Sequence, residues 1–116
     1  MNYFDRFGNP VIHIDNGDIY SFKGVPLAYV YLDTVYSFSG KQLGWFVNGW
    51  IYDMSGCPLL FSEASTGGPV KPVRRVAPVA LVNHVSRVKA ARKNKTVRPV
   101  LKMNWSNESI DSFFRD

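Results

Sequence analysis

Apolar and polar positions recur with a period of 16 residues over the first half of the chain. Each copy has an aromatic residue followed four positions later by a glycine. The two series are Phe4, Tyr20, Tyr36 and Tyr52, and Gly8, Gly24, Gly40 and Gly56. Apolar residues stand seven positions after each aromatic, and a ring stands nine positions after it, at His13, Tyr29, Trp45 and Phe61. A fixed period of this length predicts a repeat architecture.

Turn signals separate and divide the copies. Asn16-Gly17 and Asn48-Gly49 stand between copies, and Asn-Gly between apolar runs favours a type I′ hairpin, which needs positive φ at both central residues. Asp33-Thr34 is expected to form the corresponding turn between them. Within each copy, Asp or Ser stands three residues before the glycine, which favours a type I turn or a bulged loop. The pattern over residues 1–63 predicts eight short strands in an antiparallel meander, as four hairpin units.

The four units must share one core, because a two-stranded hairpin cannot bury a face by itself. A barrel, a flat meander and a ring of hairpins about a pseudo-fourfold axis all satisfy this requirement. In the third copy, Leu43, Trp45 and Val47 alternate with Phe46, which is also apolar. Both faces of the sheet are therefore expected to be covered, and the C-terminal half is the candidate cover.

The pattern Leu43-Gly44-Trp45-Phe46-x-x-Gly49-x-Ile51-Tyr52-Asp53-x-x-Gly56, followed by a basic tract rich in Pro and Val, resembles the four-fold β-flower proteins. These are small bacterial proteins, and the resemblance extends over nearly the whole chain. It implies a mainly all-β fold with four hairpins in a pseudo-fourfold arrangement, and it carries over no catalytic or ligand-binding residue. The first copy departs from the pattern at Phe4, His13 and Asp15, so one irregular unit is expected.

The periodicity changes after Gly67-Gly68. Valine then recurs every third residue, at Val70, Val73, Val76, Val79, Val82, Val85, Val88, Val97 and Val100. A period of three fits neither a strand nor an α-helix, but it is the period of polyproline II, with which four prolines in the tract agree. Residues 64–104 are therefore predicted to form an extended basic arm that packs on the repeats through its valine ridge. A helix over residues 80–93, which contain no proline, is the competing interpretation.

Residues 105–116 predict a short helix. Ser106 is the expected N-cap, Glu108 lies in the first turn, and Trp105 with Ile110 would form a hydrophobic staple. The apolar face, formed by Ile110, Phe113 and Phe114, is expected to dock on the same chain rather than on a partner.

Charge is divided between the two halves of the chain. Residues 1–68 carry three cations and six anions, whereas residues 69–105 carry ten cations and no anion. The basic tract could engage RNA, DNA or an acidic protein, or its cations could pair with the carboxylates of the repeats or remain solvated. No recognised nucleic-acid-binding motif is present. The candidate anion-binding residues are Arg74, Arg75, Arg87, Lys89, Arg92, Lys93 and Lys95.

Aromatic residues are the second candidate binding surface. Tyr29, Trp45 and Trp50 could cage a quaternary ammonium group or stack on bases, and a ligand could also lie on the fourfold axis. Packing of the same rings in the core is the alternative.

Catalytic chemistry has little support in the sequence. Cys57 with His13 or His84 is the nucleophile and base pair that the chain offers, and Cys57 follows a repeat glycine as a turn residue. Two histidines and one cysteine fall short of the four ligands of a structural zinc site. We therefore expect a non-enzymatic binding or interaction module without a cofactor, with a small hydrolase as the less favoured alternative.

A length of 116 residues predicts a single domain over residues 1–116, and one cysteine excludes an internal disulfide. The N-terminus has no basic segment followed by an apolar run, and no stretch is apolar enough to span a membrane. The expected setting is cytoplasmic, as a monomer or small homo-oligomer.

Overall fold

The computed structural model describes residues 1–93 and 95–115. Eight short strands follow one another as an antiparallel meander, in which each strand pairs with the next. Hydrogen bonds of 2.7 and 2.9 Å between the backbones of Phe4 and Phe61 bring the end of the meander back to its beginning, so the sheet nearly closes into a barrel. The predicted all-β fold is confirmed. The strands are β1 (Asn2–Phe4), β2 (Pro10–Asp15), β3 (Asp18–Ser21), β4 (Pro26–Tyr31), β5 (Thr34–Tyr36), β6 (Gln42–Val47), β7 (Trp50–Tyr52) and β8 (Pro58–Leu60).

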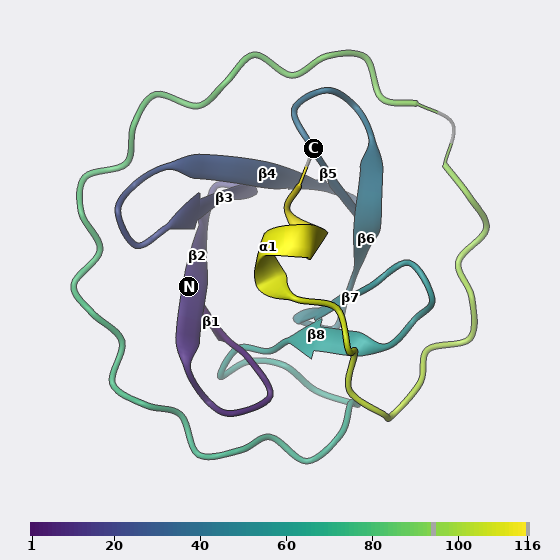
Figure 1. Cartoon of the computed structure of the whole chain (residues 1–116). Helices are drawn as coiled ribbons and strands as arrows, with labels where there is room; N and C mark the ends of the chain where they lie inside the picture. The colour runs from purple at the N-terminus through teal and green to yellow at the C-terminus, as the bar shows by residue number, and fades with distance from the viewer. Residues whose placement is uncertain (94, 116) are drawn as a thin grey trace.

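Each hairpin unit forms one petal of a disc, and the extended arm runs around the rim (Figure 1). Petals 1 to 4 are β1 with β2, β3 with β4, β5 with β6, and β7 with β8. The disc measures 36 × 35 × 22 Å. The strand register shifts at the same place in every petal, between Tyr3/Phe4, Ile19/Tyr20, Val35/Tyr36 and Ile51/Tyr52. Because a bulge increases local twist, the four shifts bend the four petals alike.

The petal tips are the predicted Asp/Ser-x-x-Gly turns. In petal 1, Oδ1 of Asp5 accepts hydrogen bonds from the amides of Phe7 and Asn9, both at 2.9 Å. The amide of Gly8 donates to the carbonyl of Asp5 at 2.9 Å, and Gly8 has a φ of 80°. Ser21, Ser37 and Asp53 begin the corresponding turns of the other petals.

Two of the three expected turns between petals are confirmed. Asn16-Gly17 and Asn48-Gly49 have positive φ at both residues. The prediction of Asp33-Thr34 is wrong by one residue, because the turn is Leu32-Asp33, with Leu32 at a φ of 55°, and Thr34 begins β5. Turns at residues 16, 32 and 48 keep the 16-residue register, which outweighs the reluctance of leucine to adopt positive φ.

The core lies along the pseudo-fourfold axis, where each petal contributes the same positions. One layer consists of Tyr3, Ile19, Val35 and Ile51, and another of Ile12, Ala28, Gly44 and Leu60. A Cβ atom on Gly44 would lie 2.2 Å from the carbonyl oxygen of Tyr52 and 2.8 Å from Cε1 of Phe113, so glycine at this position leaves room for both the strand backbone and the phenylalanine.

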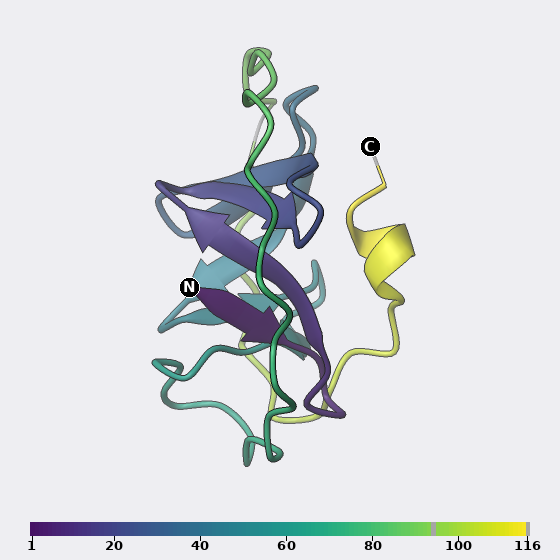
Figure 2. The same ribbon diagram turned by 90° about the vertical axis from the view of Figure 1, so that its left-hand side faces the viewer.

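Phe113 belongs to α1 (Ile110–Phe113), which covers one end of the axis (Figures 1 and 2). Ile110 and Phe114 pack against the same core, so the predicted docking of the tail on its own chain is confirmed. The helix begins later than predicted: Ser109, rather than Ser106, caps it by accepting from the amide of Ser112 at 3.1 Å. No described helix is long and apolar enough to cross a membrane.

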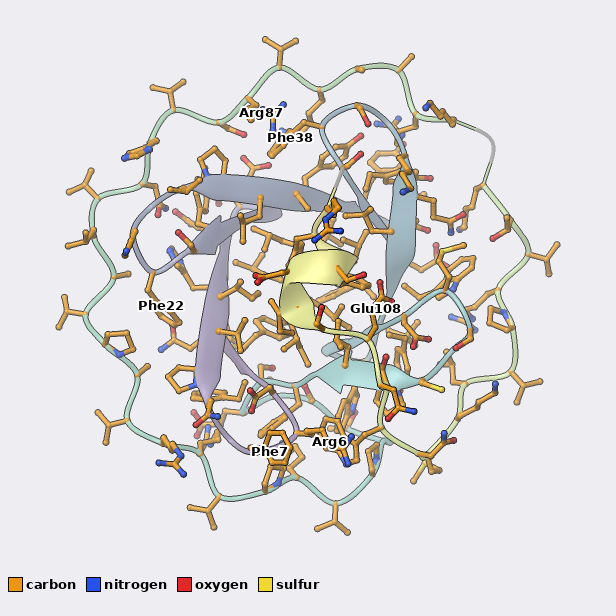
Figure 3. The ribbon with its side chains drawn as sticks, in the orientation of Figure 1. Arg6, Phe7, Phe22, Phe38, Arg87 and Glu108 are labelled. Carbon is orange, nitrogen blue, oxygen red and sulfur yellow. The ribbon has the colours of Figure 1, made fainter. Side chains whose placement is uncertain are left out.

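The arm contains no helix and no strand over residues 69–93 and 95–104, so the helical interpretation of residues 80–93 is wrong. The direction predicted for the valine ridge is also wrong. The nine valines of the tract are between 86% and 95% exposed, so they face solvent rather than the petals. Side chains project outward all along the rim in Figure 3.

Backbone hydrogen bonds, rather than valine packing, hold the arm on the petals. The carbonyls of Gly8, Gly24, Gly40 and Gly56 accept from the amides of Arg75, His84, Lys93 and Lys102 at 2.9 to 3.0 Å. A Cβ atom on Gly8 would lie only 2.0 Å from the carbonyl oxygen of Val73. Because the two backbones approach so closely, no valine side chain fits between them, and the valine face turns outward.

The contacts reveal a second period within the arm. Nine residues of the arm match 16 residues of the petals, since the donors stand at 75, 84, 93 and 102. Leu81 and Ala90 donate further bonds to the carbonyls of Phe22 and Phe38, at 2.9 and 2.8 Å. The equivalent arm positions in petals 1 and 4 are Pro72 and Pro99, which have no N–H to donate.

Candidate functional site

The basic arm has three faces, each repeating every three residues. The valines form the outward face. The residues that follow them in sequence turn toward the petals, and the residues that precede them include the backbone donors. The side chains turned toward the petals include Lys71, Arg74, Asn83, Lys89, Arg92, Lys95, Arg98 and Leu101.

Arm residues that stand nine apart contact residues at equivalent positions of the 16-residue repeat, and the first two of these contacts are polar. Nη1 of Arg74 lies 3.3 Å from Oε2 of Glu63. Nine residues further along the arm, Nδ2 of Asn83 donates to Oδ2 of Asp15 at 3.4 Å. The irregular copy expected around Asp15 therefore has a local role in holding the arm.

The next two contacts in this series use other chemistry. The guanidinium carbon of Arg92 lies 3.7 Å from the centroid of the Tyr31 ring, which is a cation–π contact. Leu101 and Val47 pack on one aromatic cluster that includes Trp45. Equivalent places along the arm thus have four kinds of contact: an ion pair, a hydrogen bond from an amide to a carboxylate, a cation–π contact and an apolar contact. We call these four contacts the clasps.

Further cations of the arm pair with the petals. Nζ of Lys89 lies 3.0 Å from Oδ1 of Asp18, and Lys95 forms an ion pair with Asp33. The hydrogen bond from Lys95 lowers the pKa of Asp33 below its usual value. The guanidinium of Arg87 lies 5.3 Å from the centroid of the Phe38 ring. Five of the seven candidate anion-binding residues, Arg74, Arg87, Lys89, Arg92 and Lys95, are therefore engaged with their own chain.

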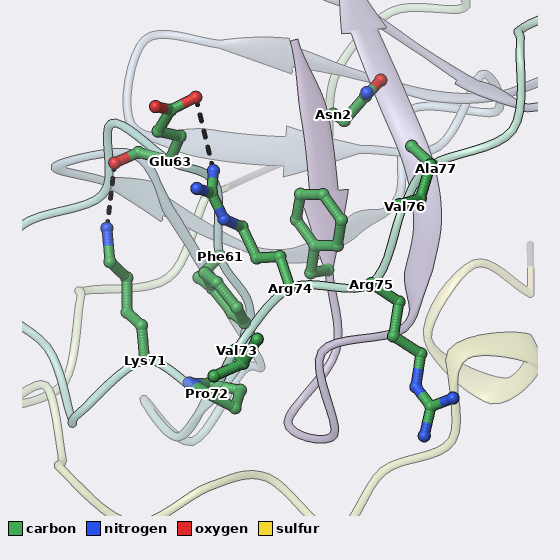
Figure 4. Close-up of a pocket in the computed structure, with 11 residues that line it drawn as sticks. Asn2, Phe61, Glu63, Lys71, Pro72, Val73, Arg74, Arg75, Val76 and Ala77 are labelled. Atoms are coloured by element: carbon green, nitrogen blue, oxygen red, sulfur yellow. Dashed lines mark hydrogen bonds and ion pairs between the residues drawn. The ribbon is translucent and has the colours of Figure 1, made fainter.

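Arg75 and Lys93 differ from these five residues. Each is exposed, and the described residues include no acidic group within ion-pair distance of either side chain. Figure 4 shows Arg75 pointing away from Arg74. Lys102 shares their position in the nine-residue period and is likewise exposed, and His84 takes the fourth position. We call Arg75, Lys93 and Lys102 the petal-tip cations.

Sequence reasoning missed Lys102, because it stands apart from the dense basic clusters. The signal that identifies it is the nine-residue spacing from Lys93. Two exposed lysines of the petals themselves, Lys23 and Lys41, stand beside the tip glycines Gly24 and Gly40. Positive charge is therefore distributed over all four tips.

The candidate aromatic surface lies in the core. Tyr29, Trp45 and Trp50 are 2%, 0% and 1% exposed. Tyr29 stacks on Tyr36 with centroids 5.7 Å apart, and Nε1 of Trp50 donates to the carbonyl of Thr66 at 3.0 Å. These three rings are therefore packed in the core, which was the alternative interpretation of the sequence.

The candidate nucleophile, Cys57, and the candidate bases, His13 and His84, have different contact partners. Sγ of Cys57 contacts Oγ of Ser55 at 3.6 Å and Nδ2 of Asn104 at 3.7 Å. His13 stacks on Tyr20 with ring centroids 5.6 Å apart, and His84 lies in the arm at the tip of petal 2. Within residues 1–93 and 95–115, no group of three His, Cys, Asp or Glu residues could hold a metal ion.

Asp53 anchors the tail to petal 4. Its Oδ1 accepts from Oγ of Ser55 at 2.7 Å and from the amide of Cys57 at 2.9 Å, and its Oδ2 accepts from Oγ of Ser106 at 2.5 Å. Burial raises the pKa of Asp53, but the hydrogen bonds from Ser106, Ser55 and the backbone outweigh burial and hold this pKa below its usual value. Ser106, expected as a helix cap, serves this contact instead.

Four equivalent hairpins around one axis, with a C-terminal arm bound to their tips, define a pseudo-fourfold β-hairpin class of fold. The family model described as 4-fold beta flower protein matches residues 1–114, and the chain belongs to this family. Neither the curated proteins nor the solved structures contain a match to the chain.

Proposed function

We propose that this protein is a non-enzymatic binding module that engages an anionic partner through the petal-tip cations. The observation that carries this proposal is the division of charge on the arm. Most arm cations satisfy acidic or aromatic groups of the petals, whereas Arg75, Lys93 and Lys102 face solvent without an acidic partner among the described residues. A solvated cation remains available to a partner, while a paired one must first give up its carboxylate.

The distribution of these cations favours a linear polyanion, and we propose single-stranded nucleic acid as the partner. The cations follow the rim at intervals of nine residues or a multiple of nine, rather than gathering in one patch. Nine residues of polyproline II chain span about 28 Å. A flexible phosphate backbone can follow such a rim and contact one tip after another, with counterion release supplying the affinity. An acidic protein would favour a compact basic patch, and it is the other outcome of the test.

The test compares two triple variants with the same loss of charge. Arg75→Gln/Lys93→Gln/Lys102→Gln removes the petal-tip cations. Lys89→Gln/Lys95→Gln/Arg98→Gln removes three cations that face Asp18 and Asp33. Fluorescence anisotropy with a labelled single-stranded RNA at low salt measures binding. We expect the petal-tip variant to lose at least tenfold in affinity and the matched variant to lose less than threefold.

Equal losses in the two variants would contradict the proposal, because they would show that net charge alone governs binding. Absence of RNA binding by the unmodified protein at low salt, together with tight binding of a polyglutamate peptide, would assign the site to an acidic protein instead. Thermal unfolding of each variant checks that the arm remains on the petals.

A further inference from the structure

A cavity of about 600 Å³ lies between the arm and petal 1 (Figure 4). Of the petal-tip cations, Arg75 lines this cavity, and Lys93 and Lys102 do not. One wall is the arm over residues 71–77, and the floor includes Phe4 and Phe61. Asn2 and Glu63 line the side where the meander closes between its first and last strands. This volume falls in the range of small-molecule sites.

The cavity wall is fixed at both ends. Nζ of Lys71 donates to the carbonyls of Ser62, Glu63 and Ser65 at 3.3, 2.9 and 3.0 Å, which ties the arm to the segment that follows β8. The amide of Arg75 donates to the carbonyl of petal 1 at Gly8, at 2.9 Å. A ligand would therefore meet a site that is already formed and would pay little for ordering it.

Arg74 lies at the mouth of the cavity in a geometry suited to a planar anion. Its guanidinium carbon is 5.8 Å from the centroid of the Phe4 ring, and its Nη1 lies 3.3 Å from Oε2 of Glu63. The Glu63 side chain is 80% exposed, so the ion pair is an exposed one of the weak kind. A guanidinium has five N–H donors in a planar fork that matches a carboxylate, and an incoming carboxylate can replace Glu63.

We propose that this cavity binds a small planar carboxylate, with its acid group on Arg74 and its ring against Phe4 and Pro72. The charge nearby favours such a ligand, because Lys71 is held by carbonyls and its positive charge is not neutralised by a carboxylate. This proposal does not rest on the proposed nucleic-acid function, because it places the acid group on Arg74 and not on Arg75, the petal-tip cation that also lines the cavity.

Equivalent places in the other petals are filled differently. At the end of petal 2, the guanidinium carbon of Arg92 lies 3.7 Å from the ring centroid of Tyr31, the residue equivalent to Glu63. In petal 4, Trp50 takes the position of Asn2 and is 1% exposed. One petal further on from the cavity, the equivalent residues Asp18 and Asp15 are held by Lys89 and Asn83 of the arm. The cavity lies where the small residue Asn2 stands beside the exposed acid Glu63.

The test uses 1-naphthoate as the probe and 1-naphthamide as its neutral isostere, with binding followed by amide chemical shifts in two-dimensional NMR. We expect saturable shifts in residues 71–77 with 1-naphthoate, and at least tenfold weaker binding of 1-naphthamide. Arg74→Gln should weaken 1-naphthoate binding about tenfold, because the charged hydrogen-bond donor is lost. Glu63→Gln should strengthen it about threefold, because the competing carboxylate is removed.

Two further variants make the result decisive. Asn2→Trp places at position 2 the residue that petal 4 has at Trp50, and it should block the cavity while the spectrum stays folded. Arg92→Gln removes an equivalent cation outside the cavity and should leave 1-naphthoate affinity within twofold. Equal effects of Arg74→Gln and Arg92→Gln, or unchanged binding to Asn2→Trp, would overturn the proposal. RNA binding measured on the same variants keeps the two proposals separate, because none of them alters a petal-tip cation.

Discussion

The backbone amide of His84 donates a hydrogen bond to the carbonyl of Gly24 at 2.9 Å, and this contact shows how the arm is attached to the petals. It joins a nine-residue period in the arm to a 16-residue period in the petals. The same contact recurs at each petal tip, and the four clasps then add side-chain contacts of different chemistry. The arm is therefore an integral part of the fold. Backbone hydrogen bonds and the clasps attach it to the petals, whereas its outward valines face solvent.

Substituting a tip glycine should detach the arm locally. A Cβ atom on Gly24 would lie 2.3 Å from the carbonyl oxygen of Val82, whereas one on Gly17 would lie 3.5 Å from its nearest neighbour. Both glycines have nearly equal φ, at 85° and 82°. Gly17→Ala should therefore cost only the backbone strain, about 1 to 2 kcal/mol, and Gly24→Ala should cost at least about 3 kcal/mol. Chemical denaturation measures both, and equal losses would contradict the close approach of the arm.

Replacing outward valines by threonine should leave stability unchanged. Val76, Val85 and Val97 are 93% to 95% exposed, and threonine keeps the β-branching that favours extended backbone. The triple variant should stay within about 0.5 kcal/mol of the original free energy of unfolding. Val35→Thr is the control, because Val35 is 0% exposed and a buried hydroxyl should cost about 1 to 3 kcal/mol. A large loss in the triple variant would show that the valine face is buried after all.

The contact between Arg92 and Tyr31 should appear as a coupling energy. A double-mutant cycle with Arg92→Gln and Tyr31→Leu should give about 0.5 to 1 kcal/mol, as expected for an exposed cation–π pair. The cycle for Arg98 and Asp33, whose charged atoms are 4.0 Å apart and partly exposed, should give less. Zero coupling in the first pair would remove the cation–π contact from the set of clasps.

Acid should destabilise the protein through Asp53. The folded-state pKa of this group lies below its unfolded-state value, so its contribution is present above the unfolded pKa of about 3.9 and is lost as pH falls through the folded pKa. Asp53→Asn should cost about 1 to 3 kcal/mol near neutral pH and progressively less below pH of about 4. Denaturation of both proteins across this pH range measures the difference. A difference that stays constant with pH would show that the charge of Asp53 has no part in the anchor.

The petals were predictable from the sequence because their signals are local. Glycine at positive φ and Asp or Ser at the start of a turn both determine the conformation of the same four residues. Each of these turn signals also recurs in all four copies of the 16-residue repeat. The one error in the turns, at Leu32-Asp33, arose where the local residue preference and the period disagreed.

The arm was predictable only in its period. Valine every third residue correctly indicated three faces, but hydrophobicity suggested that the valine face turns inward. The orientation of the arm is instead set by backbone amides, such as those of Arg75 and His84, that donate hydrogen bonds to the petals. The pattern of side chains does not indicate which amides will be hydrogen-bonded to a distant carbonyl. The division of cations into paired and petal-tip sets also depends on the same contacts between distant segments, and it became visible only in the structure.

The salt dependence of RNA binding tests the proposed function most directly. If Arg75, Lys93 and Lys102 each contact a phosphate, the slope of log affinity against log salt should fall by about 2 when all three are replaced by glutamine, since each contact with a single strand contributes about 0.7. The matched variant Lys89→Gln/Lys95→Gln/Arg98→Gln should keep nearly the original slope. Indistinguishable slopes for the original protein and the petal-tip variant would contradict the proposal that the petal tips bind the anionic partner.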